Sequence, residues 1–253
     1  MKQFTFGDIE LSEINNHYKK KRSGWFKLID VFLVVYILCI LSYLAFSIVF
    51  IKAQVIGISM QPLFNARLEY SQNPKDYDAS PYQDVAYVNR YKKGTNGDIV
   101  LLEILDNQDD PESTNIVIKR IIATGGQRVT LRREEDGNYY YYVSNDVTKM
   151  CNKFEENYVS QESRRQMRES YFETFKKCAP TVTLATEQGK GAYLIVPQGE
   201  VFVLGDNRPL SEDSHVFGTV KTEKILGKVS FYYAYNENLF SYLWSRFWGL
   251  FKA

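Results

Sequence analysis

Cysteine and histidine are scarce in this sequence of 253 residues, which has three of the first and two of the second. No Cys-x-x-Cys pair is present and His17 and His215 stand alone, so the sequence argues against a zinc site. Cys151 and Cys178 both lie in a polar region late in the chain. Two interpretations stay open for them, a disulfide in an oxidising compartment or two unrelated free thiols.

An excess of charge of one sign is also absent, because the formal net charge is +1. Such a chain has no strong field to attract nucleic acid, and the sequence predicts no nucleic-acid partner. Internal repeats and low-complexity segments are missing as well. The length suits a short anchored region followed by one domain with a core of its own.

Charged residues are missing altogether from residues 31–50, VFLVVYILCILSYLAFSIVF. A helix over this run spans ~30 Å, the thickness of a bilayer's hydrocarbon core. A cleavable signal peptide has an apolar stretch of only ~7–15 residues, followed by a small-x-small site. The run here is longer and its exit, IVFIKAQV, lacks that site. The sequence therefore predicts an uncleaved transmembrane anchor over residues 28–51.

Basic residues gather on the N-terminal side of this run, and only Lys52 follows it closely. The positive-inside rule then places the tail, residues 1–27, in the cytoplasm and the rest of the chain outside. We expect a single-pass protein of the cytoplasmic membrane, in contact with membrane lipid. The basic residues before the run are Lys19, Lys20, Lys21, Arg22 and Lys27.

Long amphipathic helical patterns are missing from the first half of the region that follows. Short β-branched or aromatic runs bounded by turn residues recur there instead. The predicted fold class is mainly β, an antiparallel barrel-like domain over residues 52–237 with residues 134–191 as an inserted mixed cap. Residues 154–178 of that cap are predicted to be helical. Strands are predicted at residues 84–89, 98–105, 115–123, 128–131, 139–143, 193–196, 201–204 and 227–233.

The last segment, residues 238–253, reads NLFSYLWSRFWGLFKA and is too short and too charged to span a bilayer. Its aromatic residues recur at helical spacing. They are interpreted either as a membrane-interfacial face or as a face that packs on the domain.

Two motifs suggest hydrolytic chemistry without proving it. Ser59 lies in GISMQP, where a glycine and a proline suit a tight turn that presents a hydroxyl. Lys119 lies between apolar neighbours in the predicted strand IVIKRII, where a lysine is unexpected. Burial lowers a lysine pKa from ~10.4, and a neutral amine can take the proton of a serine hydroxyl. Each motif alone also fits an ordinary turn or a lysine that reaches solvent.

A third motif, GDNRPLSEDS, directly follows the predicted strand at residues 201–204. Its polar side chains suit a turn that bonds its own backbone. Arg208 is expected to pair with Asp206 or Asp213. Such a network holds a wall rigid without touching a substrate.

In this order the motifs resemble those of the bacterial type I signal peptidases. The resemblance extends from about Trp25 to Tyr233 and implies an endopeptidase that removes signal peptides from exported preproteins, after small residues. It implies no cofactor and no metal, and says nothing of the oligomeric state. The residues that carry it are Gly57 to Pro62 after an anchor, Gly97 to Val100, Ile118 to Arg120, and Gly205 to Arg208 with Ser211, Asp213 and Ser214.

The resemblance also implies roles for single residues. Ser59 is the nucleophile that forms an acyl-enzyme, and Lys119 is the general base. The Ser59 N–H is half of the oxyanion hole, and Gly57 stands where many members have a serine that supplies the other half. Ser211 orients the Lys119 amine, and the site is stabilised by Asp206, Arg208 and Asp213. The substrate binds as an added strand and contacts Val55, Met60 and Ile118.

The chain departs from the family pattern at residues 125–127 (GGQ), at Pro209 and Leu210, and at His215. Three other interpretations are weighed against a signal peptidase. One is a Ser-His-Asp hydrolase with His215 as base, although a loop position beside Ser214 suits a triad poorly. Another is a DNA-bound Ser-Lys autoprotease, but those are soluble. The last is a non-catalytic module tethered to the membrane.

Overall fold

The computed structural model of the chain describes residues 24–71, 83–107, 110–145, 151–178, 184–185 and 191–249. The chain divides into two compact units, Met1–Ile48 and Val49–Ala253. Nearly all of helix α2 (Gly24–Val49) belongs to the first unit. The second unit, called the body below, contains the strands that the structure describes.

Helix α2 takes in the uncharged run up to Val49, and Phe50 already opens strand β1. At 26 residues and with no buried side chain, α2 is long and apolar enough to cross a membrane. The sequence pattern did not reveal the change to strand at Phe50, because an apolar run looks the same in a buried strand and a helix.

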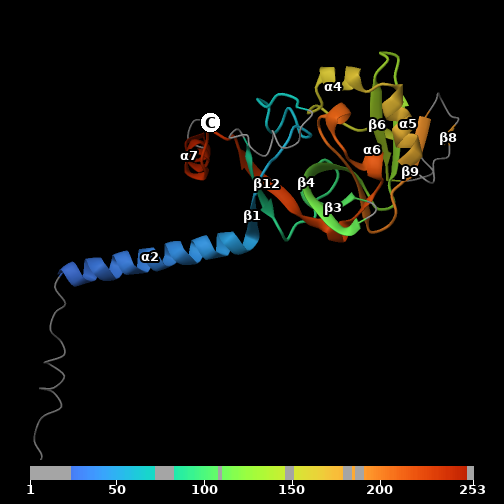
Figure 1. The fold of residues 1–253 in the computed structure, drawn as a ribbon. Helices are drawn as coiled ribbons and strands as arrows, with labels where there is room; N and C mark the ends of the chain where they lie inside the picture. The colour runs from blue at the N-terminus through green and yellow to red at the C-terminus, as the bar shows by residue number, and fades with distance from the viewer. Residues whose placement is uncertain are drawn as a thin grey trace, which may run out of the picture. The chain divides into compact units, whose positions relative to one another are not determined.

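The larger sheet of the body has seven strands in the order β1-β2-β12-β3-β4-β10-β11, and all its neighbours are antiparallel (Figure 1). Strands β3 and β4 form a long hairpin in which Lys119 pairs with Val100. The strands are β1 (Phe50–Gln54), β2 (Val85–Asn89), β3 (Ile99–Asn107), β4 (Asp110–Thr124), β10 (Glu200–Leu204), β11 (Val220–Lys221) and β12 (Ile225–Tyr233).

The smaller sheet has five strands in the order β7-β6-β5-β9-β8. The predicted insertion supplies most of it, together with helices α4 (Gln161–Gln166) and α5 (Glu169–Cys178). The helix predicted over residues 154–178 therefore begins only at Gln161 and is broken in two. The strands are β5 (Arg128–Arg133), β6 (Tyr139–Ser144), β7 (Asn152–Lys153), β8 (Leu184–Ala185) and β9 (Gly191–Ile195).

The mainly β, antiparallel fold is confirmed, and the predicted strands are all present with ends moved by a few residues. The barrel is the part that differs. Strands β1 and β11 end the larger sheet, and β7 and β8 end the smaller one. Closure needs a continuous ladder around the barrel, and β11, with two residues, is too short to supply it.

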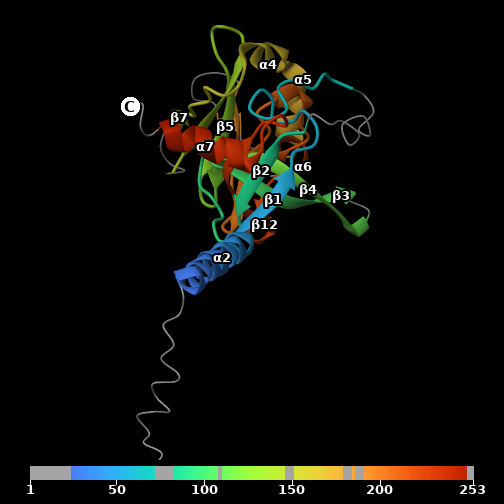
Figure 2. The same ribbon diagram turned by 90° about the vertical axis from the view of Figure 1, so that its left-hand side faces the viewer.

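The remaining described elements are short, apart from one helix. Helix α7 (Leu239–Gly249) lies beside β12 at one side of the body, and α5 lies at the opposite side, as Figure 1 shows; Figure 2 views the body from the side of α7. The short elements are the 3-10 turns η1 (Arg208–Leu210) and η2 (Thr222–Lys224) and helix α6 (Ser214–Phe217).

Aromatic packing joins the insertion to the body. The Phe175 ring of α5 meets Tyr141 of β6 edge-on at 6.0 Å and Phe202 of β10 at 5.9 Å. All three side chains are fully buried. Because these rings come from both sheets and from α5, the insertion is part of the core rather than a loop on its surface.

A buried cluster of charged side chains also joins the insertion to the body. Arg208 is fully buried and pairs with Glu156, whose other carboxylate oxygen lies 3.1 Å from Arg164 Nη1. Both Glu156 and Arg164 come from the insertion. Arg208 was expected to pair with Asp206 or Asp213, and that expectation is wrong. The insertion supplies Glu156 as the partner of the Arg208 guanidinium instead.

Cys151, one of the two cysteines considered for a disulfide, is a buried free thiol in the same region. Its Sγ lies 3.1 Å from Arg128 Nε. The side chain of Cys178 lies outside the described residues.

Replacing Glu156 by glutamine should destabilise the body strongly. It leaves the guanidinium groups of Arg208 and Arg164 buried without an anion, and losing one partner of a buried pair costs ~3–5 kcal/mol. Denaturant unfolding of the full chain in detergent measures the change. Glu155→Gln, at the exposed neighbouring position, is the matched control and should leave stability almost unchanged. Equal stability of the two variants would contradict the role given to Glu156.

Candidate active site

Ser59 lies in the loop that follows β1, half-buried between the buried side chains of Ile58 and Met60. Two residues earlier, Gly57 has φ +80, a conformation that side chains rarely adopt. A Cβ at Gly57 would meet nothing within 4 Å, so glycine is required there by the backbone and not by space. The loop can therefore turn sharply and present Ser59.

Asn65 holds this loop from behind, which the sequence analysis missed. Its Nδ2 donates to Val55 O at 2.7 Å and to Gly57 O at 2.8 Å. Its Oδ1 accepts from Asp84 N at 2.9 Å, and its own N–H donates to Asp84 Oδ2 at 2.7 Å. The sequence offers only a weak signal for this role, which is the residue type. Asn65 has φ +54 in the structure, and asparagine tolerates that conformation better than most residues.

Lys119 of β4 is only 4% exposed. Burial lowers its pKa from the ordinary lysine value, against the opposing effects of Asp213, Glu212 and Asp206, whose charges raise it. Removal from water disfavours the ammonium form, and here it outweighs the three carboxylates. A larger fraction of the amine is therefore neutral near neutral pH than for an exposed lysine.

Ser59 and Lys119 line one cavity of about 300 Å³. Val55, Met60 and Ile118, the residues predicted to contact a substrate, line it as well. The structure thus brings together residues that lie 60 positions apart in the sequence. The rest of the lining comes from Ala53, Gln54, Ile56, Leu101, Ile116 and Val117.

Gly205 is the point at which the third motif meets the Ser59 loop. A Cβ there would lie 2.2 Å from Ser211 Oγ and 2.5 Å from Ser59 O, closer than real contacts allow. Asn207 holds the same two segments together. Its N–H donates to Ser59 O at 3.0 Å, and its Nδ2 donates to Ile58 O at 3.2 Å. Glycine is therefore required at 205 by space, and the turn is bonded directly to the backbone of Ser59.

Ser211 is 4% exposed, and its hydroxyl has no hydrogen-bond partner within the described part of the chain. The bond to the Lys119 amine that the resemblance implies is therefore not formed in this structure. Ser211 nevertheless lies against Gly205, next to the Ser59 backbone.

Asp213 is fully buried and supports the Gly205 turn. Its Oδ2 accepts from Gly205 N at 2.8 Å, and its Oδ1 lies 2.7 Å from His215 Nδ1. Burial alone would raise the pKa of Asp213, but the bonds from His215 and Gly205 and the charge of Lys119 together lower it. The His215 ring stacks on Tyr171 of α5 at 4.2 Å.

The Asp213–His215 pair has two members of a Ser-His-Asp triad. His215 is not, however, among the described residues that line the cavity of Ser59. Its ring is covered by Tyr171 and it is 8% exposed. His215 therefore braces Asp213 from behind, and Lys119 is the titratable amine that shares the cavity with Ser59.

Asp206 pairs with Arg120, the neighbour of Lys119 in β4. Arg120 Nε and Nη2 lie 2.8 and 2.6 Å from the two carboxylate oxygens, a bidentate pair. Arg120 Nη1 also donates to Gly97 O at 2.7 Å. The strand that carries Lys119 is thereby bonded to the third motif. Among the described residues no group of three or more His, Cys, Asp or Glu is arranged to hold a metal ion.

Comparison with known proteins identifies a family. A family model described as signal peptidase, peptidase S26, matches residues 28–234. Signal peptidase IB of Staphylococcus aureus is 51% identical over 37 residues, and signal peptidase I of Bacillus caldolyticus is 60% identical over 38. Each alignment takes in 15% of this chain and only 19% and 21% of the relative's own length, respectively.

The chain is also similar to the crystal structure of a signal peptidase I from Enterococcus faecalis. The two are 27% identical, the match covers 55% of this chain and 98% of that one, and the TM-score is 0.34.

Replacing Asn65 by alanine should loosen the Ser59 loop without unfolding the body. It removes both bonds to the loop and leaves buried backbone groups unpaired, each costing ~1–3 kcal/mol. Hydrogen exchange should show faster exchange at residues 55–61, including the Val55 N–H that Asp84 O accepts. Asn236→Ala, at an exposed asparagine, is the control. Unchanged protection of residues 55–61 would show that Asn65 does not hold the loop.

Proposed function

The chain belongs to the signal peptidase family, peptidase S26, and from this membership we propose that it removes signal peptides from preproteins, with Ser59 as nucleophile and Lys119 as general base. One observation carries the assignment of the pair: a buried lysine with a lowered pKa shares a cavity with a serine on a constrained loop. A neutral amine beside a hydroxyl is what a Ser-Lys dyad requires.

The proposed reaction has two halves. Ser59 Oγ attacks the scissile carbonyl carbon as its proton passes to Lys119 Nζ, which then protonates the leaving amine of the mature chain. The signal peptide remains as an acyl ester on Ser59. Lys119 next takes a proton from water, the resulting hydroxide attacks the ester, and the signal peptide leaves as a carboxylate while Ser59 regains its proton.

The tetrahedral oxyanion needs hydrogen-bond donors in each half. The N–H of Ser59 is the proposed donor, since the constrained loop presents it beside the hydroxyl. Gly57 has no side chain to supply a second donor, so a second one would have to come from elsewhere. The roles proposed for Asp206, Arg208 and Asp213 are structural, and Ser211 is proposed to orient Lys119 when a substrate tightens the site.

An unpaired strand edge supports binding of the substrate in extended form. Strand β10 pairs with β4 only from Arg120 to Thr124, so no described strand pairs with residues 116–118 on that side. Ile116 there is 64% exposed. A peptide that lies along this edge adds a strand, and its alternate side chains point toward Val55, Met60 and Ile118.

Membrane attachment follows from α2 and from the family together. We further propose the orientation given by the basic residues before α2, with residues 1–27 in the cytoplasm, the anchor at 28–51 and the peptidase domain at 52–237 outside. Preproteins in transit across the same membrane are the proposed partners.

Cleavage of a preprotein with an Ala-x-Ala junction tests the proposal directly. The full chain in detergent should cut after the junction, as followed by mass. Ser59→Ala and Lys119→Ala should each lower the rate by several orders of magnitude while remaining folded. Cleavage that survives Lys119→Ala would remove lysine as the base and point to His215. An inactive wild type across several preproteins would favour the non-catalytic module.

The pH profile gives a sharper test of Lys119. The base works as the neutral amine, so activity should fall as pH drops through the Lys119 pKa. The exposed Glu212 raises that pKa by its charge. Glu212→Gln should therefore move the acidic limb of the profile to lower pH, by less than about one unit for an exposed charge, with the plateau unchanged. Glu223→Gln, exposed beside Lys224, is the control. A shift to higher pH would contradict the assignment.

A further inference from the structure

Helix α7 (Leu239–Gly249) is a well-formed element that the proposed chemistry does not use. It begins with a reciprocal cap: Ser241 N donates to Asn238 Oδ1 at 2.8 Å, and Asn238 N donates to Ser241 Oγ at 3.1 Å. This cap satisfies N–H groups that would otherwise be unpaired at the start of a helix. Helices of this length are marginal alone, so α7 depends on what its faces contact.

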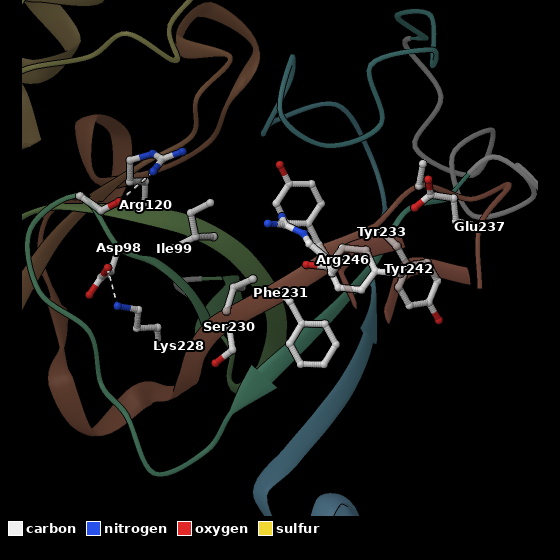
Figure 3. Close-up of a pocket in the computed structure, with 14 residues that line it drawn as sticks. Asp98, Ile99, Arg120, Lys228, Ser230, Phe231, Tyr233, Glu237, Tyr242 and Arg246 are labelled. Atoms are coloured by element: carbon white, nitrogen blue, oxygen red, sulfur yellow. Dashed lines mark hydrogen bonds and ion pairs between the residues drawn. The ribbon is translucent and has the colours of Figure 1, made fainter. Parts of the chain in front are cut away.

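One face of α7 rests on the sheet through Tyr242. Its ring stacks on Phe231 of β12 at 5.8 Å and lies 6.3 Å from Tyr233. Beside this contact is a cavity of about 550 Å³, in which Figure 3 shows Arg246 near Tyr242 and the Asp98–Lys228 ion pair farther along. In the described part of α7, Tyr242 thus makes the ring contacts with the sheet, and a cavity lies beside them.

The other face of α7 is apolar and largely exposed at its described residues. Phe240, Leu243 and Trp244 are 74%, 52% and 52% exposed, and they occupy positions i, i+3 and i+4. The rings of Phe240 and Trp244 stack on each other at 5.8 Å. Large aromatic side chains gathered on one exposed face mark a surface that has a partner.

The position of α7 close to the end of the anchor helix points to the membrane as its partner. The Phe231 ring that Tyr242 covers also contacts the ring of Phe50 at 5.6 Å. Phe50 is the first residue after α2 and so follows the anchor directly in the chain. Tyr242 of α7 is therefore two ring contacts from the residue at which the anchor ends.

Two exposed basic residues suit a lipid surface as well. Arg246 lies on α7 itself, and Lys52 lies in β1, two residues after Phe50. Cations beside tryptophan and phenylalanine at the edge of an apolar face are typical of helices that lie in the headgroup region, where each basic residue contributes ~1 kcal/mol on anionic lipid.

We propose that α7 is a second membrane contact, which lies in the interface of the bilayer that holds α2 with Phe240, Leu243 and Trp244 turned into the lipid. The two earlier interpretations of this segment then both apply, one to each face. The proposal rests on the anchoring of α2 and not on peptidase activity, so it can be tested on the Ser59→Ala variant.

Fluorescence quenching by lipid gives the test. The full chain with Ser59→Ala, Trp25→Phe and Trp248→Phe keeps Trp244 as its one tryptophan. In nanodiscs of phosphatidylcholine with bromine near the top of the acyl chain, Trp244 should be quenched to an extent similar to that of Trp25 in the matching single-tryptophan variant. Adding Phe240→Ser and Leu243→Ser should reduce that quenching at least several-fold while circular dichroism is unchanged.

The matched negative control places the probe far from α7. Ile195→Trp, in a chain whose three native tryptophans are phenylalanine, puts an exposed ring on β9, which Figure 1 shows across the body from α7. Quenching of Trp244 no stronger than at this position would overturn the proposal. A Trp244 emission that shifts with protein concentration in detergent would also overturn it, since a second copy of the chain would then cover the face.

Discussion

The proposed chemistry of this site depends on keeping the Lys119 amine out of water. A lysine that reaches solvent stays protonated near neutral pH and cannot accept the proton of a hydroxyl. Strand β4 buries the side chain by pairing with β3 at Lys119 and with β10 from Arg120 onward, and the side chain lines the same cavity as Ser59. The three carboxylates around the amine oppose the effect of burial. The lowered pKa of Lys119 is therefore a balance of opposing effects, and a small change in the residues around the amine shifts that pKa.

The residues that surround the Lys119 amine are held in place by contacts between distant parts of the chain. Gly205 touches the backbone of Ser59, Asp213 holds Gly205, and His215 holds Asp213 while Tyr171 of the insertion covers its ring. Arg208, in the same turn, is neutralised by Glu156, also of the insertion. The region that looked like a cap on the domain thus supports the candidate active site from outside, through Tyr171 and Glu156, which are not among the described residues that line the cavity.

Much of this could be predicted from the sequence because it depends on local patterns. The alternation around Lys119 predicted a buried face, and the runs of β-branched and aromatic residues predicted the strands. What could not be predicted depends on residues meeting in space. Asn65 and Asp84 look like ordinary loop residues until the fold pairs them, and the partner of Arg208 lies 52 positions away in a polar segment. Strand β1 was hidden because its apolar start continues the pattern of α2, and the two-residue β11 leaves no pattern at all.

The junction between α2 and β1 has a consequence for which substrates can be cut. No residue separates the last helical position, Val49, from the first strand position, Phe50, and β1 is paired with β2 along all of its five residues. Ser59, nine residues beyond Phe50, can lie at most ~30 Å from it. Under the proposed function, the junction of a preprotein must therefore come within that reach of the end of the anchor. The spacing between its apolar segment and its cleavage site then becomes part of the recognition signal, beside the small side chains of the junction.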